Sequence, residues 1–403
     1  MWSSKTSYAT QPPSEVAGGA APAGLQHAVG AAALLLASAV LFWLPGDGWR
    51  MRALLLLGMA LGATLYLASF SFTSAYREFI LRQGTAGLRA QILMVGLAAI
   101  LFAPVLAAGY AFGLPAGGAV APAGTQVLAG AFMFGLGMQL AGGCASGTLS
   151  AAGGGSVRMF VVLSFFCAGS FWASLHMSWW ERLPSRGEVV LGDLIGWPEA
   201  TALQLAILAT LWIWLSLLAP ERSARSSRQV RAFGIDGKLA VGGTLLAVLS
   251  FLVLLVSGHP WNITWAFALW GAKLALPFGW QPETSPFWNG DFQRTALDSS
   301  ILADVTSVTN IGIMLGALAA AAAAGRFSFR PPVSLASISA AVIGGLAMGY
   351  GARIAYGCNI GAFFSGVAST SLHGWVWIVA ALAGTAIGVR LRPWFGLKNS
   401  PRD

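Results

Sequence analysis

The chain has 403 residues, of which 56% are hydrophobic and only 9% are charged, and its mean hydropathy is +0.71. Soluble domains carry about 25% charged residues, so this composition excludes a water-soluble fold and favours an all-α bundle of membrane-spanning helices. The formal net charge is +9, but the basic residues stand at the ends of apolar runs, which is typical of membrane topology and not of nucleic-acid binding.

Apolar runs of the length that a helix needs to cross a lipid bilayer recur along the chain. The first run follows a polar leader, residues 1–27. We expect this run to be a retained helix, and a cleaved signal peptide is the alternative interpretation. Spans are predicted near 28–44, 53–70, 92–112, 127–142, 159–176 and 201–218, and, after a polar linker, near 239–257, 261–278, 305–324, 334–355 and 374–391. The run at 261–278 either crosses or lies in the interface, so nine to eleven crossings are expected.

The linker at 220–238 divides the chain into two expected membrane repeats, 28–219 and 239–392, followed by a basic tail, 393–403. It carries five basic residues against two acidic ones, which predicts a cytoplasmic location. The tail and the loop at 77–89 are also basic and are expected on the same side. The loop around Arg50 then falls outside, against the positive-inside rule.

A cysteine motif occurs once in each predicted repeat. The chain reads GLGMQLAGGCASG at 135–147 and GYGARIAYGCNIG at 349–361, and both follow GxGxxxAxGCxxG in the same register. Duplicated halves with helix-breaking glycines at matching positions are typical of transporters whose site lies at the repeat interface near the membrane midplane. The sequence therefore predicts two pseudo-symmetric repeats, expected to be inverted, with short re-entrant helices after the motifs and a site between them.

The motif glycines allow two interpretations. In the first copy Gly135, Gly143 and Gly147 are spaced by multiples of four residues, roughly one helix face, which is typical of close packing between membrane helices. Alternatively, Gly143 and its counterpart Gly357 let a helix end or unwind, so that backbone N–H groups face an anion. Packing does not require a thiol, so the repeated cysteine favours a site.

Cys144 and Cys358 are the main candidates for the site, together with Ser146 and Asn359 beside them. A buried cysteine away from cations is expected to stay a neutral thiol, which is a weak S–H donor suited to a large, diffuse sulfur atom. Cys167 has no counterpart in the second repeat, so we expect it to be a small core residue.

Gln139 and Arg353 occupy matching positions, about one turn before each Gly-Cys pair. An arginine at the centre of a spanning helix costs about 2.5–3.5 kcal/mol on insertion scales, which makes Arg353 a functional candidate that would attract an anion. The alternative is that Arg353 extends from a helix end to the cytoplasmic interface.

Other chemistries lack the residues that they need. The four histidines, His27, His176, His259 and His373, have no metal-ligand spacing, so no metal site is predicted. The sequence contains no phosphate-binding loop, nucleophile elbow or paired-carboxylate arrangement, which argues against an ATPase or hydrolase. No cofactor is expected.

The sequence resembles the YeeE/YedE sulfur-transport family of bacterial inner-membrane proteins, which includes thiosulfate uptake proteins. The resemblance rests on GGCASGTL at 142–149, GARIAYGCNIGAF at 351–363 and FSFTSAYREF at 70–79. It implies a pseudo-symmetric bundle with short re-entrant helices, in which cysteines along a central path pass thiosulfate by S–H contacts. Cys144 and Cys358 match two family cysteines, and Ser71 stands where the family has a third. That departure leaves sulfite or another sulfur or selenium compound open as the substrate.

Three functions follow as hypotheses. The first is a transporter or channel for a small sulfur-containing anion in a bacterial-type inner membrane, with Cys144, Cys358 and Ser71 lining the path. The second is a membrane thiol redox protein in which the two motif cysteines form a reversible disulfide. The third is a noncatalytic membrane subunit that holds a soluble cytoplasmic sulfur-handling partner at the linker.

Overall fold

The computed structural model describes residues 22–45, 48–218, 231–232, 235–329 and 334–399, and within them almost all regular structure is helical. The helices before the predicted linker are α1 (Ala23–Trp43), α2 (Trp49–Ala68), α3 (Phe72–Arg82), α4 (Ala86–Ala108), α5 (Thr125–Ala141), α6 (Ala145–Gly153), α7 (Val157–Ser174), α8 (Met177–Trp180), α9 (Leu191–Ile195) and α10 (Trp197–Leu218). Those after it are α11 (Gly237–Ser257), α12 (Thr264–Ala275), α13 (Asp291–Asp298), α14 (Val305–Ala323), α15 (Leu335–Ile354), α16 (Ser365–Ala368) and α17 (Leu372–Leu391).

The remaining elements are short. A π-helical segment, η6 (Asn359–Phe364), precedes α16, and 3-10 turns are η2 (Leu276–Phe278), η3 (Pro282–Thr284), η4 (Pro286–Asn289), η5 (Ile301–Ala303) and η7 (Arg392–Phe395). Three antiparallel pairs of strands join β1 (Tyr110–Ala111) to β2 (Leu114–Pro115), β3 (Pro122–Gly124) to β4 (Ser185–Glu188) and β5 (Arg231–Ala232) to β6 (Ile235–Asp236). Most of the predicted linker, the first 21 residues of the leader and the last four of the tail lie outside the described residues.

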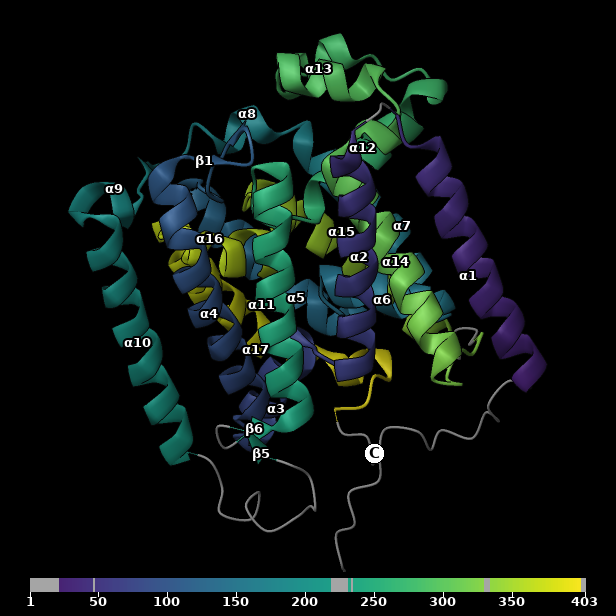
Figure 1. Ribbon diagram of the computed structural model, residues 1–403, viewed down its shortest axis with the longest axis horizontal. Coiled ribbons are helices and arrows are strands. Elements are labelled where there is room, and N and C mark those ends of the chain that lie inside the picture. The colour runs from purple at the N-terminus through teal and green to yellow at the C-terminus, as the bar shows by residue number, and fades with distance from the viewer. Residues whose placement is uncertain (1–21, 46–47, 219–230, 233–234, 330–333, 400–403) are drawn as a thin grey trace, which may run out of the picture.

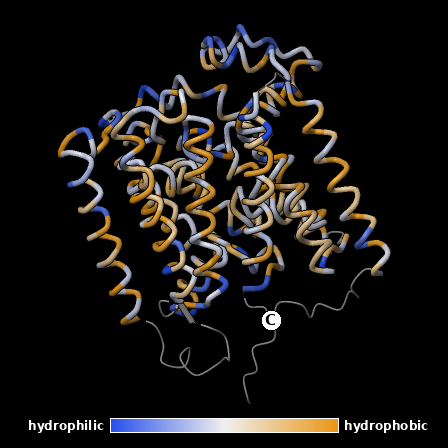
Figure 2. The backbone as a smooth tube through the Cα atoms, in the orientation of Figure 1, coloured by the Kyte–Doolittle hydropathy of each residue, from blue (hydrophilic) through white to orange (hydrophobic). Residues whose placement is uncertain are grey.

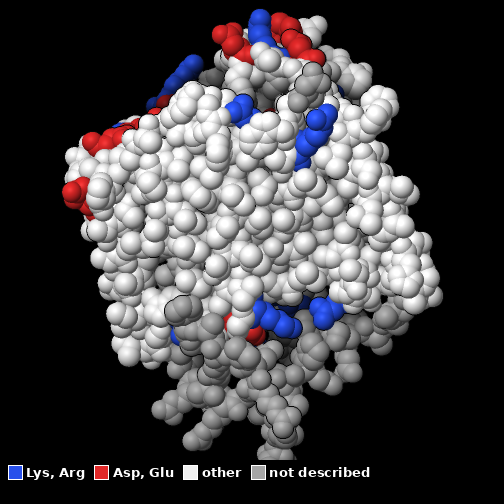
Figure 3. Space-filling model, viewed as in Figure 1, with Lys and Arg blue, Asp and Glu red and all other residues white. Residues whose placement is uncertain are grey.

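Ten helical segments in the described part of the chain are long and apolar enough to cross a membrane, within the predicted range of nine to eleven. The run predicted at 261–278 does not qualify, because α12 has only 12 residues and ends in the η2 turn. Figure 2 shows the apolar residues along the long helices, and Figure 3 shows charged side chains gathered at the two ends of the bundle with an uncharged belt between them. The protein is therefore a multi-pass membrane protein.

The two ends of the bundle differ in what they carry (Figure 1). At one end, which we call the linker end, α10 ends, α11 begins and the C-terminal segment lies; the turn between α3 and α4 lies there as well. The opposite end, which we call the α13 end, carries α8, β1 and α13. Arg50 belongs to the α13 end, where its Nη2 donates to the Phe112 carbonyl oxygen at 2.5 Å. The described parts of the three predicted basic segments therefore share one end, and Arg50 lies at the other.

The helices that carry the two cysteine motifs run in opposite directions. Helix α5 starts at the α13 end, beside the β3–β4 pair, whereas α15 starts at the linker end after α14. The packing partners are exchanged between the halves: α5 lies against α17 and α15 against α7, while α6 lies against α14 and α16 against α4. Inverted repeats would require this arrangement, and the duplication itself stays a prediction.

Glycines set the close approach of these helices. A Cβ atom built on Gly137 would lie 2.8 Å from the Gly344 carbonyl oxygen, and one built on Gly344 would lie 2.8 Å from that of Gly137. Cβ atoms at Gly135 and Gly349 would collide with the backbone at Ala381 and Phe166. Because lipid tails give helices little hydrophobic reason to associate, this backbone contact supplies much of the packing energy.

Candidate functional site

Both cysteine motifs break a helix at the same motif position. Helix α5 ends at Ala141, and Gly142 follows with a φ of 82°. Helix α15 ends at Ile354, and Tyr356, which occupies the position matching Gly142, has a φ of 58°. A residue with a side chain costs about 1–3 kcal/mol in this left-handed region, and glycine does not. The second copy keeps the break although it has tyrosine there. The predicted helix end is present, and the predicted single face for Gly135, Gly143 and Gly147 is wrong because the helix does not continue past the break.

Each motif cysteine stands at the start of the short helix that follows the break. Cys144 precedes α6, and Cys358 precedes η6. The backbone N–H groups at matching positions, Gly147 in one copy and Gly361 in the other, interact with the two thiols. The predicted neighbour Ser146 contacts Cys144, with 3.4 Å between Oγ and Sγ. The breaks thus present a sulfur atom and helix N–H groups together, which is an arrangement that favours an anion.

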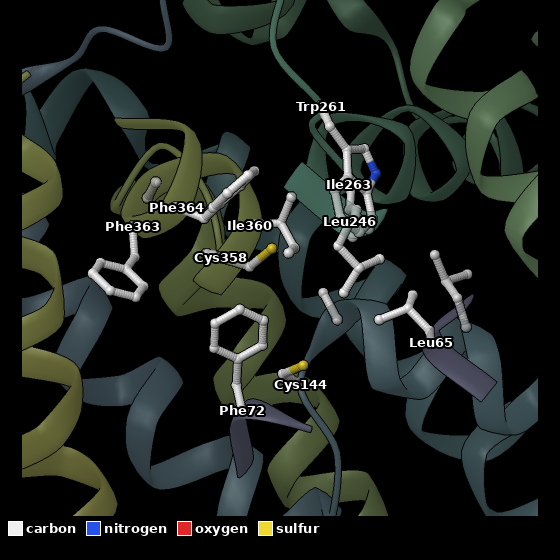
Figure 4. Close-up of a cluster of buried hydrophobic side chains, with 14 of the residues drawn as sticks. Leu65, Phe72, Cys144, Leu246, Trp261, Ile263, Cys358, Ile360, Phe363 and Phe364 are labelled. Atoms are coloured by element: carbon white, nitrogen blue, oxygen red, sulfur yellow. The ribbon is translucent and has the colours of Figure 1, made fainter. Parts of the chain in front are cut away.

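Both thiols are buried in the same hydrophobic cluster. Cys144 is 2% exposed and Cys358 is 0% exposed. Figure 4 shows Phe72 beside Cys144, Ile360 beside Cys358, and Leu246 and Ile263 near them. Apolar side chains therefore close the centre of the bundle around the two sulfur atoms.

The third sequence motif, on α3, is held between the other two. Gln139 Nε2 donates to the Thr73 carbonyl oxygen at 3.1 Å, and Asn359 Nδ2 donates to the Tyr76 hydroxyl at 3.2 Å. Gln139 and Asn359 are fully buried, so they join the motif segments to α3 and do not line open space. The structure thus brings together segments from three distant parts of the sequence.

The remaining predicted residues have mainly local roles in this state. Ser71 is half-buried and caps α3, since its Oγ accepts from the Ser74 N–H at 3.2 Å. A Cβ atom on Gly143 would have ordinary contacts near 3.5 Å, whereas one on Gly357 would lie 2.6 Å from the Ala362 nitrogen. Gly357 is therefore required by the tight turn, and Gly143 is not.

A cavity of about 530 Å³ opens at the α13 end and reaches the second motif at Tyr356 and Gly361. Arg353 contributes to its wall, with its Cζ 5.0 Å from the centre of the Phe287 ring. Its Nε is buried and has no hydrogen-bond partner in the described part of the chain, and the Glu181 carboxylate acts electrostatically on the guanidinium. Arg353 lies in the last turn of α15, at the α13 end and away from the basic segments of the linker end, so an extension to the cytoplasmic interface would require the α13 end to be cytoplasmic.

Asp304 is the single Asp or Glu among the described residues that line this cavity. Its carboxylate caps α14 by accepting from the Ser307 N–H at 2.7 Å, and it accepts from Trp265 Nε1 at 3.0 Å. Burial raises the pKa of Asp304, and these hydrogen bonds oppose that shift. The cavity therefore places one arginine and one partly shielded acid in its wall, so specific donors must add to the attraction that Arg353 gives an anion.

Two arginines that the sequence reasoning missed hold the end of α5. Arg158 donates to the carbonyl oxygens of Leu140, at 2.7 Å, and Ala141. Arg392 Nη1 donates to the carbonyl oxygen of Gln139 at 2.5 Å. A helix end leaves its last carbonyl oxygens without partners, which is costly in lipid, and a cation there is favourable. These residues fix the backbone just before Cys144.

The start of α12 was also missed. The residues at this start read Trp261-Asn262-Ile263-Thr264 and repeat the pattern of Phe70-Ser71-Phe72-Thr73 at the start of α3: aromatic, polar, apolar and threonine. Ile263 lies near the thiols, and Trp261 and Asn262 line the cavity. A comparison of the two halves upstream of the cysteine motifs would have found this signal.

Within the described residues no group of three or more His, Cys, Asp or Glu side chains could hold a metal ion, and the three cysteines are free. The site is therefore built from thiols, backbone N–H groups and a few polar side chains.

Comparisons with known proteins add an independent result. The family model described as sulphur transport matches residues 67–387. The chain is 37% identical over 135 residues to "Probable transporter YedE" of Escherichia coli K12, an alignment that covers 34% of this chain and 33% of that relative. It is 28% identical over 341 residues to "Thiosulfate transporter TsuA" of Spirochaeta thermophila, covering 80% of this chain and 93% of that relative. It is 25% identical over 343 residues to the protein of the same name in E. coli K12, covering 82% and 91%.

Proposed function

Because the chain belongs to the sulphur transport family, we propose that it carries a small sulfur-containing anion, with thiosulfate first to be tested, past the thiols of Cys144 and Cys358. The family and the names of the relatives indicate a transporter and not an enzyme. Thiosulfate is what two relatives are named for, and both align over most of their length.

The observation that carries this proposal is the matched pair of breaks. Each break ends a long helix and puts a thiol at the N-terminus of a short helix, in the middle of the bundle. A thiol and helix N–H groups can replace part of the hydration shell of an anion without holding it as tightly as a full charge would, and passage requires binding that is weak enough to release.

The closed hydrophobic cluster around the thiols fits a resting state. At 0–2% exposure the two thiols are out of contact with bulk water. Movement of side chains such as Phe72, which lies beside Cys144, would open the way between the two thiols (Figure 4). An apolar constriction of this kind prevents ion leakage when no substrate is present.

We propose that the protein lies in a bacterial-type inner membrane, with the linker end on the cytoplasmic side and the cavity on the outer side. The basic segments at the linker end support this orientation by the positive-inside rule. A soluble sulfur-handling partner at residues 220–238 stays a hypothesis about a segment that lies mostly outside the described residues.

The direct test is uptake of radiolabelled thiosulfate by cells that lack other sulfur uptake systems. Cells that express the chain are expected to accumulate label at least tenfold faster than cells with an empty vector. Absence of uptake at verified membrane expression would exclude thiosulfate, and labelled sulfite would then be tested in the same cells.

Replacing Arg353 by glutamine is expected to raise the KM for uptake about tenfold and to leave the maximal rate nearly unchanged. Arg353 lies in the cavity, before the thiols, so its charge would contribute to binding and not to later steps. Initial rates over a range of thiosulfate concentrations measure this, and Arg353→Lys should recover part of the affinity. An unchanged KM in the glutamine variant would remove Arg353 from the path.

Replacing Ser71 by cysteine is expected to increase thiosulfate uptake about threefold, because a third soft S–H donor would then precede Phe72, which lies beside Cys144. Ser74→Cys is the matched control, since Ser74 lies on the same turn with an exposed side chain. Rates are compared at equal membrane expression. Equal gains in both variants would mean that position 71 has no special access to the path.

A further inference from the structure

Trp261 carries a buried donor without an acceptor. The residue is 0% exposed, and its indole Nε1 has no hydrogen-bond partner among the described residues. An indole N–H can only donate, so no alternative assignment of its hydrogen satisfies it. A buried donor without a partner is costly and uncommon, and it requires an explanation.

Other tryptophans of this region do have acceptors. The indole N–H groups of Trp265, Trp270, Trp288 and Trp377 donate to Asp304 at 3.0 Å, Ser307 at 2.9 Å, Ser174 at 2.8 Å and the Gly357 carbonyl oxygen at 3.3 Å. The fold therefore supplies acceptors to tryptophans that have a structural role here. Trp261 is an exception at a point where a ligand would pass.

Trp261 lies near Cys358 (Figure 4). It borders the cavity at the α13 end, and its carbonyl oxygen accepts from the Ser365 hydroxyl at 2.9 Å, which ties it to the start of α16, directly after η6. Figure 4 shows Trp261 above Ile263 and Leu246, in the cluster that contains Cys358. Arg353 borders the same cavity, and its buried Nε also has no acceptor within the described ranges.

We propose that the indole N–H of Trp261 and the guanidinium of Arg353 form an oxyanion subsite, which binds the oxygen-bearing end of the sulfur anion before it reaches Cys358. This inference rests on the proposed function and adds the substrate class, which is sulfur oxyanions in preference to hydrosulfide. The two kinds of donor bind different atoms of the anion: N–H donors suit oxygen atoms, whereas the thiol suits sulfur. In the resting state both donors are covered, and a dehydrated anion supplies the missing acceptor.

The test uses the purified full-length protein and the variant Trp261→Phe, which keeps an aromatic ring and removes the N–H group. Trp265→Phe is the matched control, because Trp265 borders the same cavity but already donates to Asp304. Binding of thiosulfate, sulfite and hydrosulfide is measured by calorimetry, after size-exclusion chromatography has verified each variant. Trp261→Phe is expected to bind the two oxyanions about tenfold more weakly and hydrosulfide as the wild type does.

The outcomes separate this subsite from the proposed function. If the wild type binds and transports thiosulfate but Trp261→Phe binds it as Trp265→Phe does, the subsite is overturned and the function stands. If sulfite binds and depends on Trp261 whereas thiosulfate does not bind, the subsite stands and the substrate changes. Binding of no oxyanion by the wild type overturns the subsite. Should Trp261→Phe fail to fold, Arg353→Gln takes its place with the same expected loss for oxyanions alone.

Discussion

Alanine in place of either Cys144 or Cys358 is expected to reduce thiosulfate uptake at least tenfold. Both thiols are buried in the hydrophobic cluster at the centre of the bundle, and a substrate passes both along the path that we propose. Losing a hydrogen bond to a charged ligand costs about 1.5–3 kcal/mol, which corresponds to roughly ten- to a hundredfold. Uptake of labelled thiosulfate at matched membrane expression measures the effect.

Cys167→Ala is the control for this experiment. Cys167 is also buried, at 7% exposure, but it lies within α7, away from both breaks. It is expected to keep near-normal uptake. Normal uptake by a Cys144→Ala, Cys358→Ala double variant would show that the path does not use thiols. If activity instead depended on a reversible crosslink between the two cysteines, detected by trapping free thiols before and after oxidant, the redox hypothesis would replace the transporter mechanism.

Replacing Gly349 by alanine is expected to destabilise the protein by about 1–3 kcal/mol, and replacement by leucine is expected to leave little folded protein in the membrane. Gly349 lies where α15 crosses α7, and a Cβ atom there would collide with the Phe166 carbonyl oxygen and lie 2.7 Å from the Ser170 nitrogen. Both obstacles are helix backbone and cannot rotate away, so the two helices would have to separate. Thermal unfolding monitored by size-exclusion chromatography measures the loss.

Gly24 provides the control for Gly349. It lies near the start of α1, and a Cβ atom there would have no neighbour within 4 Å. Gly24→Leu is expected to have the same unfolding temperature as the wild type. A Gly349→Ala variant as stable as Gly24→Leu would mean that α15 and α7 are not in close contact. Gly135, the matching position in the first motif, is expected to behave as Gly349 does, because a Cβ atom there would collide with the Ala381 carbonyl oxygen of α17.

The sequence alone determined the class of protein and the positions of most membrane helices. Every backbone polar group must be satisfied within its own segment in lipid, so a long apolar run forms a helix regardless of its neighbours. The spans predicted at 305–324 and 374–391, for example, correspond to α14 and α17 within two residues at each end. The breaks at the cysteine motifs were also predictable, because Gly-Gly-Cys and its copy interrupt an otherwise continuous run.

Only the tertiary structure decided which side chains meet. Arg353 could have reached an interface or a cavity, and the choice depended on the direction of α15, which its own sequence does not contain. The bridges from Gln139 and Asn359 to α3, the arginines that hold the end of α5, and the unpaired donor of Trp261 all join segments that are far apart in the chain. Lipid fixes each helix separately, whereas the site forms from contacts between helices, and those depend on where glycines let two backbones touch.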